Sequence, residues 1–196
     1  LSQYGLPKEP TVQEKVAQCG ELVSFSGDKL LGGVQAGIIV GKKEWIEQLQ
    51  AHPIKRALRC DKVILAGLEA TLRLYLNPEK LTEKLPTLRL LTQPLEQLKI
   101  NATRLKERLE SRLNSQFEIR IEDSQAQIGS GSQPMERIPS MAVTIAEKTN
   151  AKLSALSARF KQLSQPIIGR MENGKIWLDL RSLADIETLL NILDEL

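Results

Sequence analysis

The chain has 196 residues, enough for one large domain or two small ones. Its hydrophobic content of 41% and charged content of 26% are typical of a globular protein, and a formal net charge of +3 does not by itself demand a nucleic-acid partner. No apolar run is long enough to span a bilayer, so we expect no membrane partner. Two cysteines without metal-ligand spacing and a single histidine argue against a disulfide framework and a metal site, and they suit a reducing cytoplasm.

The first residues, Leu1–Pro7, do not begin with methionine and match neither a signal peptide nor a transit peptide. They are typical of a connecting segment, so we expect the chain to be a fragment of a larger protein. A short helix is predicted over Pro10–Ala17, because Thr11 and Glu14 have the spacing of a capping box.

Two short apolar runs, Glu21–Ser26 and Ala36–Gly41, predict buried strands of an α/β sheet. Sites in open α/β sheets lie at the carboxyl ends of strands, and the first run delivers Lys29 to such an end. Helices are predicted over Lys42–Ala51 and Asp61–Leu76, where apolar residues recur at helical spacing.

A long amphipathic helix is predicted over Thr87–Leu113, with leucines at helical spacing and lysine and glutamate between them. From Phe117 onward, the sequence pattern is typical of strands and turns. The elements expected there are strands over Phe117–Ile121 and Ser140–Ile145, a helix over Ala151–Leu163, a hairpin of Ile167–Met171 and Lys175–Asp179, and a helix over Leu183–Leu193. This order predicts a small α+β domain with helices packed on one face of a sheet. Ile128–Ser132 is interpreted as a flexible loop, since it lacks the Gly-Lys-Ser/Thr ending of a P-loop.

The segment Ser24–Gly33 is the most suggestive of chemistry. Lys29 follows a small Ser-Gly step and an acid, and glycines on both sides let a ligand approach the backbone closely. One hypothesis is a Schiff-base lysine for pyridoxal phosphate, with Ser26 near the cofactor phosphate and Asp28 tuning charge beside the amine. A second is a Ser-x-x-Lys acyl-transfer motif with Ser26 as nucleophile, although its partner motifs are absent. A third is a plain loop with an exposed lysine.

A second cluster of charge lies in His52–Lys62. Arg56 and Arg59 are three residues apart, so on a helix they share a face and could clamp a phosphate or carboxylate. The alternative is a solvated helix start.

The ordered segments Ser26–Gly33, Gln35–Lys43 and His52–Lys62 together resemble the bacterial selenocysteine synthases, the L-seryl-tRNA(Sec) selenium transferases. The resemblance extends along essentially the whole chain, through Leu85–Leu91, Ile128–Ser132, Ile168–Arg170 and Trp177–Arg181.

This resemblance implies an α/β protein, a fold-type I pyridoxal-phosphate-dependent transferase. Residues 1–84 would be the C-terminal portion of the large cofactor domain with its connecting helix, and residues 85–196 a small α+β C-terminal domain. By the same resemblance, Lys29 holds pyridoxal 5'-phosphate as an internal aldimine and Asp28 is an active-site acid. Arg56 and Arg59 match arginines that grip the anionic selenium donor.

The implied reaction converts L-seryl-tRNA(Sec) to L-selenocysteinyl-tRNA(Sec) through a dehydroalanyl intermediate, with selenophosphate as the selenium donor. Lys29, once displaced from the cofactor, is the natural base for the α-proton. The family also implies a cytoplasmic, ring-shaped homo-oligomer, expected to be a decamer.

Two departures from the family pattern stand out. Val34 takes the place of an expected proline in the run after Lys29. The family's tRNA-binding region, phosphate-cup loop and pyridine-nitrogen acid are expected upstream of Leu1, so the fragment should be inactive alone. Two alternatives stay open: another fold-type I lyase or transferase acting on a free amino acid, and a non-catalytic remnant or interaction module.

Overall fold

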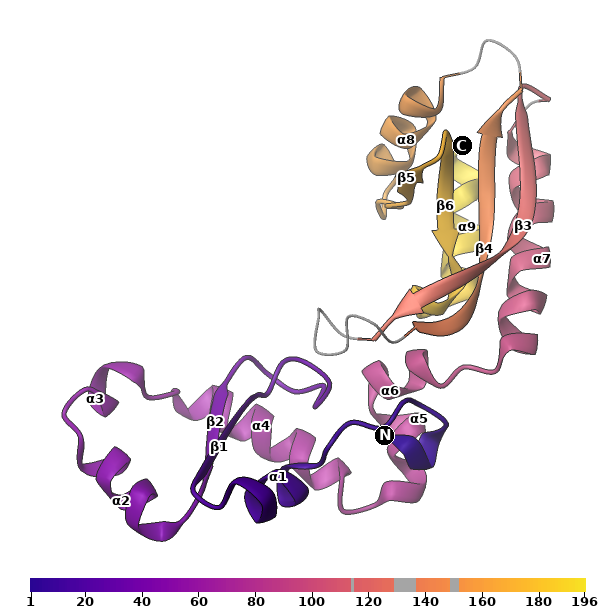
Figure 1. Cartoon of the computed structure of the whole chain (residues 1–196). Helices are drawn as coiled ribbons and strands as arrows, with labels where there is room; N and C mark the ends of the chain where they lie inside the picture. The colour runs from indigo at the N-terminus through magenta and orange to yellow at the C-terminus, as the bar shows by residue number, and fades with distance from the viewer. Residues whose placement is uncertain (114, 129–136, 149–151) are drawn as a thin grey trace. The chain divides into compact units, whose positions relative to one another are not determined.

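The computed structural model describes residues 1–113, 115–128, 137–148 and 152–196. Most of the segment predicted as a glycine-rich loop, 129–132, lies outside them. The described chain forms two compact units, coloured indigo to magenta and magenta to yellow in Figure 1. Among the described residues, the N-terminal unit is built from residues 1–92 together with Ile128, and the C-terminal unit from the described parts of residues 93–127 and 137–196.

The N-terminal unit opens with a 3-10 turn, Ser2–Tyr4, and helix α1, Val12–Cys19. The predicted capping box is confirmed. Thr11 Oγ1 accepts a hydrogen bond from Glu14 N at 3.2 Å, and the Glu14 carboxylate accepts one from Thr11 N at 2.7 Å. These bonds favour the ionised carboxylate and lower the pKa of Glu14.

Strands β1, Leu22–Ser26, and β2, Gly37–Gly41, form an antiparallel pair that runs from Leu22 opposite Gly41 to Ser26 opposite Gly37. Both predicted strands are therefore confirmed, but the prediction that they are buried is wrong, since no residue of either strand is fully buried, and their pairing is antiparallel. Segment 27–36 between them contains no helix, and parallel neighbours need a long crossover, usually helical. Alternate residues of β1 are exposed, so within the described chain only one face of this strand is covered.

Helices dominate the rest of the N-terminal unit: α2 Lys43–Ala51, α3 Lys55–Leu58, α4 Lys62–Leu74, the 3-10 turn Pro78–Lys80, α5 Leu81–Lys84 and α6 Pro86–Leu91. Asp61 begins α4, since its Oδ1 accepts hydrogen bonds from Val63 N at 2.8 Å and Ile64 N at 2.9 Å. This confirms the predicted helix start.

The single long helix predicted over Thr87–Leu113 is wrong, because the chain forms α6 and then α7, Leu95–Arg112. Pro94 sits at the break as the residue before α7. Proline has no N–H and its ring clashes with the carbonyl four residues earlier, so a helix cannot run through it undisturbed. Thr92 closes α6 by donating its hydroxyl to Leu88 O at 2.7 Å.

The C-terminal unit contains a four-stranded antiparallel sheet in the order β3-β4-β6-β5. Its strands are β3 Phe117–Gln127, β4 Arg137–Glu147, β5 Arg170–Glu172 and β6 Lys175–Asp179. The predicted hairpin and its turn are confirmed, although its first strand is Arg170–Glu172 and not Ile167–Met171. Asn173 and Gly174 at the turn have φ of 51° and 69°, the left-handed values that a type I′ turn requires. The first two strands are longer than predicted.

The helices of this unit are α7, α8 Leu153–Gln162 and α9 Ile186–Ile192, with 3-10 turns Leu180–Ser182 (η3) and Leu193–Glu195 (η4). All of them share one hydrophobic core with the sheet, and α7 and α9 lie side by side against it in Figure 1. Asp185 caps α9 by accepting hydrogen bonds from Glu187 N and Thr188 N, so α9 begins later than predicted. The predicted packing of helices on one face of a sheet is confirmed.

The two units differ in how they cover apolar side chains. Ten of the thirteen exposed large apolar side chains among the described residues belong to the N-terminal unit. These are Leu22, Ile39, Trp45, Leu49, Ile54, Leu58, Val63, Leu65, Leu72 and Leu76. No described helix combines the length and the hydropathy needed to cross a membrane.

Candidate functional site

Lys29 lies in a turn whose shape is set by the backbone. Gly27 N donates to Ala36 O at 2.8 Å, and Gly33 N returns a bond to Gly27 O, also at 2.8 Å. Gly32 N donates to Lys29 O at 2.9 Å, and Gly32 has a φ of 72°, which side-chain-bearing residues adopt at a cost. The turn therefore presents Lys29 at a defined point between β1 and β2.

The Lys29 amine is accessible and is paired with an acid. Its Nζ lies 3.2 Å from Asp28 Oδ2, and half of the Lys29 side chain is exposed. A primary amine that solvent can reach, on a turn fixed by glycines and beside a carboxylate, suits the capture of an aldehyde such as that of pyridoxal phosphate. The donor set of this turn thus fits the predicted cofactor.

Ser26 is the last residue of β1 and is exposed. No hydrogen bond joins its side chain to Lys29 within the described chain. The structure therefore brings Asp28 and Lys29 together, while Ser26 lies at the edge of the same turn.

Arg56 and Arg59 do not share a helical face, so that part of the prediction is wrong. Helix α3 ends at Leu58, and Arg59 is extended, with φ −67° and ψ 135°. The reason is local: Asp61 must be extended to cap α4, and this leaves no room for α3 to continue into it. Both residues are exposed, and the ion pair of the Lys29 amine in the described chain is with Asp28.

Sequence reasoning missed the support beneath the lysine turn. Tyr75, at the end of α4, donates its hydroxyl to Leu31 O at 2.9 Å, and Thr71 and Gly67 lie against Gly33 and Val34. These α4 residues were predicted only as the apolar face of a helix. The available signal was the glycine inside the helix, because such a glycine often marks a close approach of another segment.

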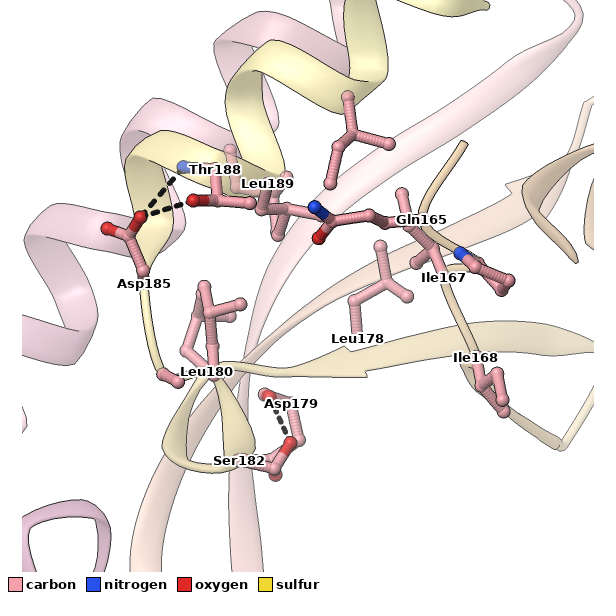
Figure 2. Close-up of a pocket in the computed structure, with 15 residues that line it drawn as sticks. Gln165, Ile167, Ile168, Leu178, Asp179, Leu180, Ser182, Asp185, Thr188 and Leu189 are labelled. Carbon is pink, nitrogen blue, oxygen red and sulfur yellow. Dashed lines mark hydrogen bonds between the residues drawn. The ribbon is translucent and has the colours of Figure 1, made fainter. Parts of the chain in front are cut away.

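A cleft of about 630 Å³ opens in the C-terminal unit between β6, η3 and α9 (Figure 2). Its walls combine apolar and polar side chains, and its carboxylates already have partners. Asp185 caps α9, and Asp179 accepts hydrogen bonds from Ser124 and Ser140 at 2.6 Å each. The cleft therefore offers a mixed polar and apolar surface, and both of its carboxylates are already hydrogen-bonded. Within the described residues, no group of three or more His, Cys, Asp or Glu side chains could hold a metal ion.

A family model described as SelA, L-seryl-tRNA selenium transferase, matches residues 1–184. The chain belongs to this family. It is 93% identical over 196 residues to the L-seryl-tRNA(Sec) selenium transferase of Haemophilus influenzae. It is 71% and 67% identical over the same length to the proteins of that name from Mannheimia succiniciproducens and Pasteurella multocida.

The match to these L-seryl-tRNA(Sec) selenium transferases covers all of this chain and 42% to 43% of each relative. The chain thus spans less than half the length of the curated relatives it matches. Its mixed α/β architecture is consistent with the selenium transferase family.

Proposed function

We propose that this chain carries the cofactor lysine of a pyridoxal-phosphate-dependent L-seryl-tRNA(Sec) selenium transferase of fold type I. The enzyme would convert L-seryl-tRNA(Sec) to L-selenocysteinyl-tRNA(Sec) with selenophosphate as donor, in the cytoplasm and as a ring-shaped decamer. The observation that carries the proposal is the accessible Lys29 amine on its glycine-fixed turn beside Asp28, in a chain of this family. The division into a large domain through residue 84 and a small domain from residue 85 belongs to the same proposal.

Pyridoxal phosphate, when bound, withdraws electrons from the α-carbon of an attached amino acid. Lys29 Nζ would hold the cofactor, and as a free amine it would be the group that accepts the α-proton of the seryl group. Asp28 Oδ2, 3.2 Å from Nζ, stabilises the protonated amine. Ser26 lies at the end of β1, close enough in the chain to contribute a hydroxyl to the phosphate of the cofactor.

Arg56 and Arg59 are proposed to bind the anionic selenium donor. Both are exposed, and neither forms a salt bridge within the described residues, so both guanidinium groups are available to an external anion. Guanidinium groups suit this role because their planar N–H donors match a phosphate in pairs.

The first experiment is absorption spectroscopy of the full-length protein mixed with pyridoxal phosphate. We expect the band of a lysine-bound cofactor in the wild type and in Lys42→Ala, and its loss in Lys29→Ala. Lys42 is a matched control, because its amine lies 3.3 Å from Glu21 and half of its side chain is exposed, much like Lys29. A band that persists in Lys29→Ala would remove Lys29 as the anchor, and no band in the wild type would favour a non-catalytic module.

The second experiment supplies full-length enzyme with seryl-tRNA(Sec) and labelled selenophosphate. We expect the label to become bound to tRNA, and Arg56→Ala and Arg59→Ala to raise the selenophosphate concentration needed for half-maximal rate. Label that enters only free amino acids would instead establish another pyridoxal-phosphate transferase.

A further inference from the structure

One face of α4 lies against the turn that carries Lys29. Its contact residues, Gly67, Thr71 and Tyr75, are four residues apart in turn, which places them along one side of the helix. Each meets a different residue of the segment that follows Lys29. About two helical turns of α4 therefore lie along the segment that follows Lys29.

The closest approach is at Gly67. A Cβ built on Gly67 would lie 2.8 Å from Val34 Cγ1, so the helix has no room for a side chain there. One turn later, a Cβ on Gly33 would lie 3.3 Å from Thr71 Cγ2. Thr71 is itself held in place, since its hydroxyl donates to Gly67 O at 3.0 Å. At Gly67 the backbone of the helix packs against the Val34 side chain, and at Gly33 the backbone of the turn packs against the Thr71 side chain.

Tyr75 supplies the polar contact of this face. Its phenol donates to Leu31 O at 2.9 Å, and Leu31 is two residues after Lys29. The tyrosine is half-buried, and burial together with nearby Tyr4 raises the pKa of its hydroxyl. The group therefore stays protonated and remains a donor across the physiological pH range.

We propose that Tyr75 is a positioning residue for Lys29: its phenol anchors the Leu31 carbonyl and thereby fixes the turn that aims the lysine amine at pyridoxal phosphate. This inference rests on the proposed function. The turn has its own backbone hydrogen bonds, but all of these lie within residues 27–36. The Tyr75 bond is the hydrogen bond that ties this turn to α4 in the described chain. Its loss should leave the turn formed and let it move against the helix.

The test uses full-length protein with Tyr75→Phe, which keeps the ring and removes one hydroxyl. The matched control is Tyr4→Phe, since the Tyr4 phenol also donates to a backbone carbonyl, that of Pro78 at 3.0 Å, outside the lysine turn. Without cofactor, we expect hydrogen exchange of the peptide covering residues 26–33 to become about fivefold faster in Tyr75→Phe and to stay unchanged in the control.

With cofactor, we expect Tyr75→Phe to retain the band of the lysine-bound cofactor but to shift the pH at which that band titrates. We also expect kcat to fall about fivefold while KM for seryl-tRNA(Sec) stays within about twofold. A role in stability alone would move neither the titration nor the ratio of kcat to KM.

The possible failures are distinguishable. If the wild type shows no band, or Lys29→Ala keeps it, the proposed function fails. If the wild type and Lys29→Ala behave as expected and Tyr75→Phe matches Tyr4→Phe in exchange, titration and kcat, only the positioning role is overturned. Should Tyr75→Phe yield too little folded protein, Thr71→Ser decides by the same readouts, because it keeps the hydroxyl and removes the methyl group that packs on Gly33.

Discussion

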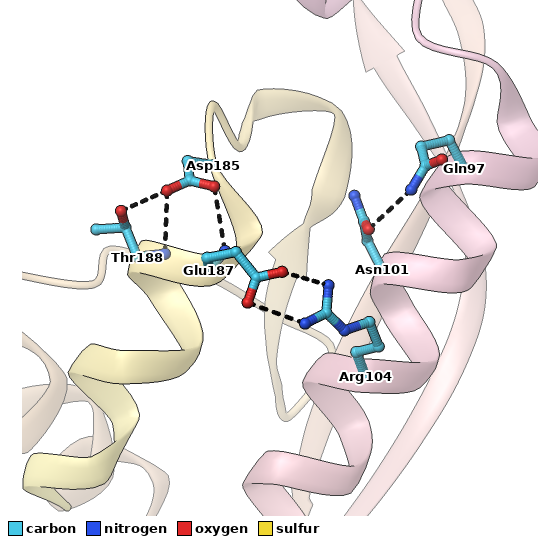
Figure 3. A network of polar contacts seen from close by, with 6 residues as sticks. All are labelled: Gln97, Asn101, Arg104, Asp185, Glu187 and Thr188. Carbon is cyan, nitrogen blue, oxygen red and sulfur yellow. Dashed lines mark hydrogen bonds and ion pairs between the residues drawn. The ribbon is translucent and has the colours of Figure 1, made fainter.

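Arg104 on α7 and Glu187 on α9 meet through two parallel contacts, Nη1 to Oε1 at 2.7 Å and Nη2 to Oε2 at 3.0 Å (Figure 3). A second connection joins α7 to the 3-10 turn η4 that follows α9, where Asp194 pairs with both Arg108 and Arg112. Exposed ion pairs contribute little to stability one at a time. Together, these pairs fix α9 and η4 along α7.

These pairs predict a loss of stability in acid. Hydrogen bonds from arginine lower the pKa values of Glu187 and Asp194 below their ordinary values of 4.5 and 3.8. A carboxylate whose pKa is lower in the folded state stabilises the fold fully above its ordinary value, and this contribution is lost as the pH falls through the folded-state pKa. We expect Asp194→Asn to destabilise the C-terminal unit at pH 7 and to flatten its decline below about pH 4.

The measurement is urea unfolding followed by Trp177 fluorescence in a Trp45→Phe background, since the two tryptophans lie one in each unit. Glu110→Gln is the control, because Glu110 forms only a 3.6 Å contact with Lys106 on its own helix. An equal pH dependence in Asp194→Asn and Glu110→Gln would contradict the prediction.

Two glycines with nearly the same backbone conformation predict different costs of substitution. Gly32 and Gly174 have φ of 72° and 69°, so alanine costs about 1–2 kcal/mol at either position. A Cβ on Gly32 would also lie 3.0 Å from Leu85 Cδ1, whereas a Cβ on Gly174 meets nothing within 4 Å. We expect Gly32→Ala to cost about 1 kcal/mol more than Gly174→Ala, because Leu85 is tightly buried.

Gly32→Ala should also weaken the band of the lysine-bound cofactor in the full-length protein, and Gly174→Ala should not. Urea unfolding, followed by Trp45 for Gly32→Ala and by Trp177 for Gly174→Ala, gives the two stabilities. Equal losses would show that Leu85 moves aside freely.

The stability of the C-terminal unit should depend on the buried hydrogen bonds of Arg181. It is only 6% exposed, and its Nε and Nη2 donate to Pro139 O at 3.1 and 2.6 Å, while Nη1 donates to Gln93 O at 3.0 Å. Arg181→Met removes these donors from both carbonyls and should cost about 2–4 kcal/mol. Arg181→Lys should cost less, since one ammonium can reach one of them. Urea unfolding followed by Trp177 fluorescence ranks the variants by their free energy of unfolding. An Arg181→Met variant as stable as the wild type would contradict the prediction.

The uncovered apolar side chains of the N-terminal unit predict that the 196-residue chain aggregates when it is produced alone. Leu58, Val63 and Leu76 are each more than 70% exposed, and exposed apolar area of this extent promotes association. Size-exclusion chromatography and binding of an apolar dye measure this. A monomer that unfolds cooperatively would refute the prediction, and residues 93–196 alone serve as the well-behaved control.

Local signals carried most of the sequence prediction. The Thr11 capping box, the Asn173-Gly174 turn and the start of α4 at Asp61 depend on residues a few positions apart, so the pattern alone determined them. The pairing of β1 and β2 depends on how the chain returns after Lys29, and apolar runs do not encode that direction.

The features that were missed or predicted wrongly depend on single residues or distant partners that override the local pattern. The leucine periodicity continues across Pro94 and predicted one helix, but the proline interrupts it and separates α6 from α7. The shared face of Arg56 and Arg59 assumed a helix that the Asp61 cap ends early. The hydrogen bond from Tyr75 to Leu31 O could not be predicted, because the two residues are 44 positions apart in the chain and a backbone acceptor leaves no mark in the sequence.

The contact between Arg181 and Gln93 has a practical consequence for dissecting this protein. Helix α7 begins at Leu95, and a cut placed there would delete the carbonyl that Arg181 Nη1 binds. The C-terminal unit begins at Gln93, so the shortest excisable module that keeps the Arg181 clamp begins two residues before the helix. A module that begins at Gln93 keeps every carbonyl acceptor of Arg181 named above, whereas one that begins at Leu95 loses the Gln93 carbonyl that Nη1 binds, while Nε and Nη2 still donate to Pro139 O.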